Sequence, residues 1–520
     1  MSSVGVVLEP ERSDPAPTDP APTDGMHPTG DGGTRSGRRS FGSVGALALM
    51  IGGIAALISA RPISDNSFLT HLATGRLIVE SGLPTQNPFL YSSTSFPVPS
   101  YWWSIALGVV DDLGGGSALR LLTGLLGGLL GVLLVRLAAG APGHRFDTVR
   151  GDGAVIGDGP TPGLLAVVVP AALTLMCVFQ FLSGRPHLIG FVLLALMVLV
   201  WRERRSPWWL VPIFTVWVNV HGSWLYGLVV IGMFVVAEVV DSRRPHARQM
   251  SMIATAVLGA LLGGALYPDR FALILLPTRQ FGDPIEREAL QAYNEWRRVG
   301  LDEPMLWMMV GLALLALYGC IRQRRYAMTA VVALLVAMGV SGLRLVPIAA
   351  IALVPFAALG LSGIGTLRLP TGRAAMATKM VGGLICLGAV TYSVVGPAYE
   401  LSSFPVEATD WLEARDLVGN DTKVVTHDIG GNYLEWRFGD RANTWVDDRP
   451  GAATLLDYAE LQRFTDDWSQ ALDRADGDVL IWETRGKLTG ALEEDPDWVV
   501  GTTAGSYTVF CRVELADRCA

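Results

Sequence analysis

Three side chains that can take part in acid–base or phosphate chemistry lie close together early in the chain. Asp65, His71 and Arg76 bring a carboxylate, an imidazole and a guanidinium into one short segment. A carboxylate can accept a proton from an attacking hydroxyl or hold a divalent cation. A guanidinium offers a forked, permanently charged donor to phosphate oxygens. This combination predicts a site for a phosphate-bearing substrate, with Asp65 as its base or, if a metal takes part, as the metal ligand.

More polar residues of the same kinds stand at or near the ends of apolar segments far along the chain. They are Arg185, His187, Asn219, His221, Glu295 and Arg344. Ionisable groups near membrane depth are costly and usually face a polar cavity. Asn219 and His221 lie at a tight turn, where a structural hydrogen bond and a contact with substrate fit equally well.

The elements that must position these residues are membrane spans. The chain has 520 residues, of which 50% are hydrophobic and 17% charged, and its mean hydropathy is +0.38. Soluble proteins carry roughly a quarter charged residues. Several apolar runs are long enough to cross a hydrocarbon core of about 30 Å. We therefore predict an α-helical polytopic membrane protein with about 11 spans, at approximately 44–60, 117–139, 164–182, 187–201, 207–220, 224–241, 250–267, 304–320, 326–341, 344–364 and 376–397.

Arginines in the short connections predict the orientation of these spans. Cytoplasmic loops carry an excess of Lys and Arg, which assigns the connections at 202–205, 243–248, 322–325 and 368–373 to the cytoplasm. The N-terminus is then predicted inside and the C-terminus outside. Alternation places every polar residue named above on the outer side, whereas a random scatter would put about half on each side. We expect a polar cavity that opens outward and is ringed by span ends.

The segment 61–116 is predicted to be one large outer loop with two surface helices. Residues 101–110 look like a short span, but counting them as one would place the arginines at 35–39 outside. We interpret 101–110 as a helix in the outer interface, with its Tyr and Trp residues at headgroup depth. Residues 68–81 predict a second such helix, which ends at Gly82.

Both ends of the chain differ in composition from the apolar middle. Residues 1–43 contain a repeated Asp-Pro-Ala-Pro-Thr and predict a disordered cytoplasmic tail. Residues 400–520 are acidic and predict a small outer α/β domain, with strands at 423–427, 444–447, 478–482 and 507–513 and helices at 406–416, 455–464 and 467–475. Residues 44–399 form the membrane domain between them.

Two motifs of the predicted outer domain have more than one interpretation. Asp447-Asp448-Arg449 resembles a metal-binding acidic pair, but a turn at a strand end accounts for it more simply. His427 and Asp428 are also interpreted as a strand-end turn. Cys511 and Cys519 fit a disulfide outside the cytoplasm and free thiols equally well.

The first outer loop also carries a family resemblance. Asp65, the run from His71 to Arg76 and the later Asn87-Pro88-Phe89 resemble the first loop of a bacterial group within the GT-C superfamily of membrane glycosyltransferases. The segment 217–222 and Arg344 match as well, and the resemblance covers most of 44–400. It implies a polyprenyl-phosphate-linked sugar donor, two juxtamembrane helices and Asp65 as base or metal ligand. Asn87 stands where the group often has an acidic residue, which argues against a second acidic metal ligand.

The leading functional hypothesis is a glycosyltransferase that moves a sugar from this donor to an extracytoplasmic acceptor, which would be a cell-envelope glycan, lipid or protein. Asp65, His71 and Glu295 are the predicted catalytic residues, and the predicted substrate-binding residues are Arg76, Arg185, His187, Asn219, His221 and Arg344. The cofactor expected, if the reaction uses one, is a divalent cation, Mg²⁺ or Mn²⁺. The predicted surroundings are membrane lipids, and no nucleic-acid partner is expected.

Two other functions compete with this hypothesis. One is a transporter or flippase for a lipid-linked glycan, and the other is a non-catalytic scaffold of the cell envelope. Transporters commonly show internal repeats and polar sites near the membrane midplane. The spans show no repeat and the polar residues gather on one face, which favours transfer over transport.

Overall fold

The computed structural model describes residues 33–140, 148–149, 155–156, 163–243, 247–282, 284, 297–362, 367–419, 421–449 and 452–520. The predicted catalytic Glu295 and residues 1–32 of the predicted tail lie outside these ranges. Helix α1 begins at Gly33, so residues 33–43 of the predicted tail are helical.

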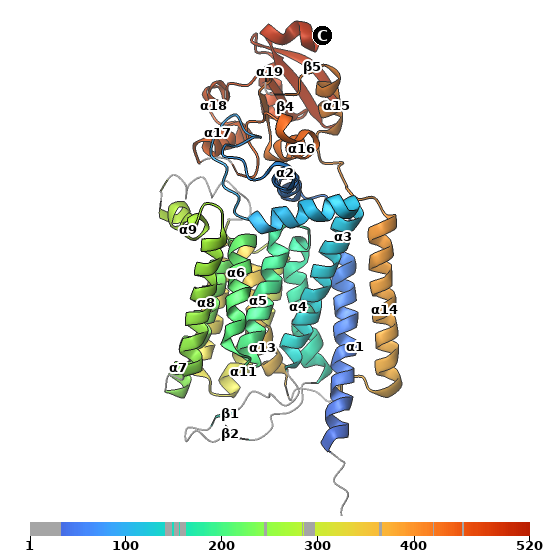
Figure 1. The fold of residues 1–520 in the computed structure, drawn as a ribbon, viewed down its shortest axis with the longest axis vertical. Helices are drawn as coiled ribbons and strands as arrows, with labels where there is room; N and C mark the ends of the chain where they lie inside the picture. Colours follow the sequence, from blue (N-terminus) through green and yellow to red (C-terminus); the bar gives the residue numbers. More distant parts are fainter. Residues whose placement is uncertain are drawn as a thin grey trace, which may run out of the picture.

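The described residues form a bundle of apolar helices with a small mixed domain at one end (Figure 1). Eight helices are long and apolar enough to cross a membrane, and three shorter apolar segments, 186–202, 207–220 and 326–340, accompany them. The prediction of an α-helical polytopic protein is confirmed. The helices are α1 (Gly33–Ser59), α3 (Tyr101–Ala139), α4 (Leu164–Val178), α5 (Pro186–Arg202), α6 (Leu210–Val220), α7 (Trp224–Ser242), α8 (Ala247–Leu266), α11 (Pro304–Arg322), α12 (Tyr326–Val340), α13 (Val346–Leu361) and α14 (Gly372–Val395).

Short elements complete the bundle. The 3₁₀ turns Phe179–Phe181, Pro207–Trp209 and Leu343–Leu345 extend α4, α6 and α13, and α9 (Ala272–Gly282) is a further short helix. Two residues each form β1 (Thr148–Val149) and β2 (Val155–Ile156), which pair antiparallel.

Helix α13 forms the centre of the bundle. Every residue from Val346 to Gly360 is buried, and α4, α5, α11 and α12 pack around it. A helix that is apolar on all sides belongs in the middle of a bundle. Helix α14 shows the opposite pattern, because it stands beside α1 at the edge and leaves most of its apolar side chains exposed (Figure 1).

The first loop folds into two helices that lie across the end of the bundle, as the sequence predicts. One is α2 (Asn66–Ser81), and the other is the first part of α3 (Figure 1). The predicted stop at 111–112 is wrong, since α3 continues to a kink at Gly114 and Gly115 before it turns down as a span. Gly115 has φ +59°, a conformation that favours glycine. Asp111 stays helical and pairs with Arg76 of α2.

Helices α2 and α3 cross at two glycines. A Cβ on Gly75 would overlap the backbone carbonyl of Ser104, and one on Gly108 would overlap the backbone of Gly75. The Gly of the His-Leu-Ala-Thr-Gly-Arg motif is therefore required by packing. Asp65 caps the start of α2 by accepting a hydrogen bond from the Phe68 amide at 3.2 Å.

The C-terminal residues form a four-stranded sheet with helices around it. The strand order is β3 (Val424–Thr426), β4 (Val479–Glu483), β6 (Tyr507–Arg512) and β5 (Trp498–Ala504). β3 and β4 are parallel and the other pairs antiparallel. The helices are α15 (Val406–Ala414), α16 (Asp428–Phe438), α17 (Ala452–Arg463), α18 (Trp468–Ala475), α19 (Lys487–Glu493) and α20 (Ala516–Cys519), with 3₁₀ turns at Gly439–Arg441 and Val513–Leu515.

Four of these elements were not predicted from the sequence: β5, α16, α19 and α20. His427-Asp428 begins α16 instead of making a simple turn. Two glycines at the start of α16 disfavour a helix locally. Packing compensates, because Gly431 lies so close to the Val446 carbonyl that no side chain would fit there. The predicted strand at 444–447 is reduced to isolated bridges at Thr444.

The first loop and the C-terminal domain are joined through the backbone. Thr444 bridges Val424 on one side and Leu90 of the first loop on the other. The Thr444 amide donates to the Phe89 carbonyl at 2.9 Å, and the Tyr91 amide donates to the Thr444 carbonyl at 3.2 Å. The loop thus extends the edge of the domain sheet. A disulfide joins Cys511 of β6 to Cys519 of α20.

The α2–α3 crossing can be tested with one small substitution. Gly75→Ala is expected to lower the free energy of unfolding by roughly 1–3 kcal/mol, because the methyl group forces two backbones apart. Gly232→Ala is the matched control, since a Cβ there has no neighbour within 4 Å. Thermal unfolding in detergent measures both; equal stability of the two variants would contradict the close crossing.

The predicted sidedness can be tested with two exposed serines at opposite ends of the bundle. Ser81 ends α2, and Ser206 lies between α5 and the turn that leads into α6. We expect a membrane-impermeant maleimide to label Ser81→Cys in intact cells and Ser206→Cys only after permeabilisation. The unaltered chain, whose free cysteines are Cys177, Cys320 and Cys386, gives the background. The reverse labelling pattern would invert the topology.

Candidate functional site

A polar cavity of about 160 Å³ lies where the first loop, the bundle and the C-terminal domain meet. Asp65 and Asn66 of the first loop, Ser183 and Arg185 before α5, and Ile429 of α16 are among its lining residues. Segments more than a hundred residues apart therefore contribute to one wall. Of the predicted site residues, Asp65 and Arg185 line this cavity.

Asp65 and Arg185 form an ion pair in this cavity. The Arg185 Nε lies 2.6 Å from Asp65 Oδ1 and 2.5 Å from Oδ2, and its NH2 donates to Asn66 Oδ1 at 3.1 Å. Ser183 Oγ donates to Asp65 Oδ2 at 3.1 Å. Both side chains keep only partial exposure, 15% for Asp65 and 20% for Arg185. The carboxylate therefore caps α2 and at the same time fixes the chain that leads into α5.

Arg344, His187 and His221 form a second cluster at the same end of the bundle. Arg344 NH2 lies 2.8 Å from His187 Nε2, and the rings of His187 and His221 are 4.3 Å apart. His221 Nδ1 contacts Ser223 Oγ at 2.7 Å, and that hydroxyl also accepts the Trp217 indole N–H. Arg344 and His187, which are 157 positions apart, are thus brought into contact.

His71 lies on α2 above these helices and is partly exposed. Its Nδ1 is 3.1 Å from Ser104 Oγ of α3. Burial, with added repulsion from Arg449 and Arg185, lowers the pKa of His71 to about 3. The ring is therefore neutral at physiological pH, where it can donate one hydrogen bond and accept another but cannot hold a charge.

Arg76 and Asn219 take part in packing. Arg76 Nε pairs with Asp111 at 2.7 Å, and its NH1 donates to the Trp436 carbonyl at 3.3 Å, which connects α2 to α3 and α16. Asn219 is fully buried and donates to the carbonyls of Thr215 and Gly263, which holds α6 against α8. Of the two roles that the sequence left open for Asn219, these contacts favour the structural one.

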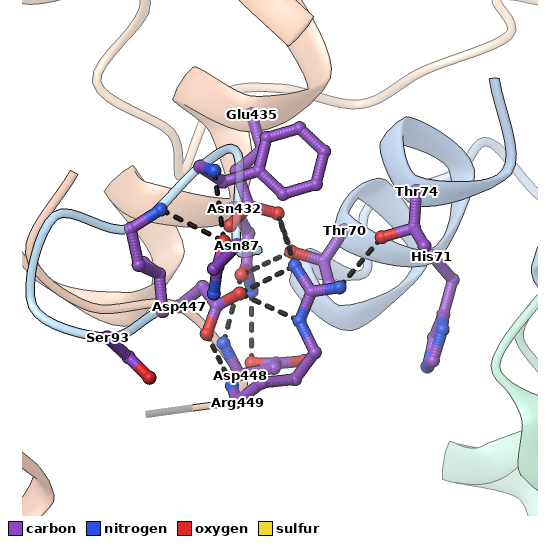
Figure 2. Close-up of polar contacts among 12 residues, drawn as sticks. Thr70, His71, Thr74, Asn87, Ser93, Asn432, Glu435, Asp447, Asp448 and Arg449 are labelled. Carbon is purple, nitrogen blue, oxygen red and sulfur yellow. Dashed lines mark hydrogen bonds and ion pairs between the residues drawn. The ribbon is translucent and has the colours of Figure 1, made fainter. Parts of the chain in front are cut away.

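A buried network of the C-terminal domain was missed by the sequence interpretation (Figure 2). Arg449 pairs with Glu435 at 2.9 Å and with Asp447 at 2.6 Å, and both carboxyl groups are fully buried. The Arg449 NH1 donates to Thr74 Oγ1 of α2 at 2.7 Å, while Thr70 donates to Glu435 Oε2 at 2.8 Å. Burial and the neighbouring Asp447 raise the pKa of Glu435. The acidic pair at 447–448 thus belongs to an ionic connection between the domain and α2.

Asp448 extends this network toward Arg185. Asn432 Nδ2 donates to Asp448 Oδ1 at 3.0 Å. Burial raises the pKa of Asp448 from 3.8 to about 6, with Asp428 adding to the shift and Arg185 opposing it. A carboxyl group that titrates near neutral pH can exchange a proton under physiological conditions. The sequence signal was the Asp-Asp-Arg run, but only the fold brings it near Arg185.

Asp428 links the cavity to the interior of the C-terminal domain. Its Oδ2 accepts from Asn66 Nδ2 at 3.2 Å, and its Oδ1 accepts from the Tyr458 hydroxyl at 2.8 Å. Asn87 has a local role, because its Oδ1 accepts hydrogen bonds from the amides of Phe89 and Leu90 within the first loop. That side chain shapes the loop that joins the sheet.

The surroundings of Asp65 do not fit a divalent cation. Its two oxygens already accept from Arg185, Ser183 and the Phe68 amide, and a cation would meet the guanidinium directly. Among the described residues no group of three or more His, Cys, Asp or Glu side chains is placed to hold a metal ion. We therefore derive no catalytic step through a metal.

The shifted pKa of Asp448 predicts a pH-dependent stability. A carboxyl group whose pKa is higher in the folded protein than in the unfolded chain destabilises the folded protein when the pH is above the folded-state pKa. This destabilisation disappears when the pH falls below the unfolded-state pKa. Asp448→Asn should therefore unfold at a higher temperature than the unaltered chain above about pH 6. The difference should vanish near pH 4. Thermal unfolding from pH 4 to 8 measures this, and a difference independent of pH would contradict it.

Comparisons with known proteins find similarity to solved structures. No protein-family model matches the sequence, and no curated protein matches it. The crystal structure of the Archaeoglobus fulgidus oligosaccharyltransferase, tethered through a disulfide bond to an acceptor peptide with the NVT sequon, is similar over 84% of this chain and 69% of that chain. The TM-score is 0.47 and the sequence identity 11%. A likeness of this strength assigns neither a fold family nor an activity to the chain.

Proposed function

We propose that this protein is a GT-C-type membrane glycosyltransferase that moves a sugar from a polyprenyl-phosphate carrier to an acceptor outside the cytoplasm. The observation that carries the proposal is the polar end of the bundle, where Asp65 and Arg185 line a cavity and Arg344 lies against His187. A lipid-linked donor needs such a place, because its chain stays in the bilayer while its phosphate requires cationic partners.

The proposed reaction is a displacement at the anomeric carbon. The oxygen of an acceptor hydroxyl attacks this carbon, and the bond from the carbon to the phosphate oxygen breaks. The hydroxyl proton passes to Asp65, and the electron pair of the broken bond leaves with the polyprenyl phosphate. Arg185 and Arg344 stabilise the phosphate charge, which grows as the bond breaks.

The ion pair between Asp65 and Arg185 must open before Asp65 can act as the base. While the pair is closed, the guanidinium of Arg185 contacts both oxygens of the Asp65 carboxylate at 2.5–2.6 Å. A donor phosphate competes with the carboxylate for the same guanidinium. Binding of the donor would thus draw Arg185 away and expose the base only when there is a substrate to react.

The neutral His71 and the titratable Asp448 supply the remaining polar groups. His71 can orient an acceptor hydroxyl without repelling Arg185, since its ring carries no charge. Asp448, whose pKa is raised by burial to about 6, can exchange a proton near neutral pH. Arg76 and Asn219 act through the packing of their helices.

A transporter remains the second candidate, but no observation favours it. Transporters place their polar site near the membrane midplane, whereas the residues discussed here lie at helix ends and in the first loop. The proposed topology puts the N-terminus in the cytoplasm and the C-terminal domain outside, in the cell envelope.

The proposal is tested by Asp65→Asn. Asn caps a helix as well as Asp, so the variant should fold while losing the charge. We expect transfer to fall by about 100-fold or more, the usual effect of removing a general base. The assay uses proteoliposomes, radiolabelled polyprenyl-phosphate hexose and pentose as donors, and a cell-envelope glycan extract as acceptor.

Asp112→Asn is the matched control, because Asp112 is an exposed carboxylate on α3 outside the lining of the cavity. It should transfer sugar at the rate of the unaltered protein. Unchanged transfer by Asp65→Asn would remove Asp65 from catalysis. Absence of transfer by the unaltered protein with either donor would favour a scaffold.

A further inference from the structure

A second cavity, of about 360 Å³, lies within the C-terminal domain. Its lining includes His427, Asp428, Phe464, Trp482, Glu483 and Lys487. Small-molecule sites have volumes of roughly 300–1,000 Å³, so this cavity is large enough for a sugar residue or a short glycan end. Apart from Asp428, which bonds to Asn66, none of these residues takes part in the site described above.

His427 lines this cavity, and one of its two ring nitrogens has no hydrogen-bond partner. The side chain is 8% exposed, and its ring stacks on Trp482 with the ring centres 3.8 Å apart. Its Nδ1 lies 3.4 Å from the Tyr458 hydroxyl, whereas its Nε2 is buried and has no hydrogen bond. Buried polar atoms are nearly always paired, so an unpaired one in a cavity wall indicates a position for a ligand atom.

The charges around this cavity are balanced. Asp428 and Glu483 contribute two carboxylates, and Arg463 and Lys487 contribute two cations. Burial lowers the pKa of His427 to about 4, so its ring is neutral at physiological pH. A wall that offers donors and acceptors in equal measure without net charge suits hydroxyl groups, each of which donates and accepts. It does not suit a phosphate or another strong anion.

The two cavities are separated by the first turn of α16. Ile429 lines both of them. Asp428, its neighbour, lines the domain cavity and accepts a hydrogen bond from Asn66, which lines the cavity at Asp65. A ligand held in the domain cavity therefore lies on the other side of Ile429 from the cavity that Asp65 lines.

We propose that the domain cavity binds a neutral glycan portion of the acceptor, and that His427 Nε2 hydrogen-bonds one of its hydroxyls. The bound glycan directs its reactive hydroxyl past the start of α16 toward Asp65. This inference rests on the proposed function, because it names the class of acceptor for that reaction.

Binding is measured with the full chain carrying Asp65→Asn in lipid nanodiscs, so that no transfer interferes. Mannotriose and arabinotriose serve as neutral probes and trigalacturonic acid as the anionic probe, with affinities from saturation-transfer NMR titrations. We expect at least one neutral trisaccharide to bind and the anionic one to bind at least tenfold more weakly.

Two exposed glutamines give a matched pair of variants. Gln462 lies on α17 at the cavity, and Gln470 lies on α18 outside its lining. Gln462→Trp should weaken binding of the neutral probe at least tenfold, and Gln470→Trp should leave it within twofold. His427→Phe keeps an aromatic ring against Trp482 but removes Nε2, and a several-fold loss is expected.

Three results would overturn the inference: no binding of either neutral probe, tighter binding of the anionic probe, or equal affinities of the two tryptophan variants. Failure of the transfer reaction is a separate result. If the unaltered protein transfers no sugar but the neutral probe binds as described, the proposed function fails and the glycan site stands. If transfer occurs without such binding, only this inference fails.

Discussion

The contact between Asp65 and Arg185 is the interaction on which the polar end of the bundle depends. One carboxylate accepts the Phe68 amide at the start of α2 and holds the guanidinium that precedes α5. Helix α2 is thereby fixed above the bundle at one end, and its crossing with α3 at Gly75 and Gly108 fixes it further along. An ion pair in a partly buried place is strong only when its geometry is well held. The cap and the Ser183 hydroxyl provide that geometry.

The C-terminal domain is attached to the first loop by two kinds of contact. Backbone bonds at Phe89, Tyr91 and Thr444 extend the sheet, and Arg449 carries the ionic connection to α2. Arg449 places its charge between two buried carboxyl groups and donates to the Thr74 hydroxyl (Figure 2). Removing one partner from such a network leaves a buried charge uncompensated. The domain and the first loop are therefore joined into one cover over the helix ends.

Charge is distributed so that His71 is neutral and both Arg185 and Arg344 have a partner. His71 is kept uncharged by burial and by Arg449 and Arg185. Arg344 lies against His187, and Arg185 against Asp65. A phosphate entering this region meets two cations, and it can replace the histidine ring or the carboxylate that is now their partner. The same arrangement explains why the surroundings of Asp65 are unsuited to a divalent cation.

The sequence alone was enough to predict that the chain is a membrane protein and where its apolar helices lie. It also predicted that Asp65 and Arg185 come to the same end of the bundle. Long apolar runs and arginine-rich turns act locally and leave a strong pattern. The two surface helices of the first loop were also predictable, because counting 101–110 as a span conflicts with the arginines before α1.

Only the tertiary structure decided which polar groups touch. Asp65 and Arg185 are 120 positions apart and Thr74 and Arg449 are 375 apart, so no local pattern predicts either pair. The helix α16 was missed because its glycines disfavour a helix in isolation, while close packing against Val446 requires them. The packing contacts of Asn219 and Arg76 could not be predicted for the same reason, since burial and partners are properties of the fold and not of residue type.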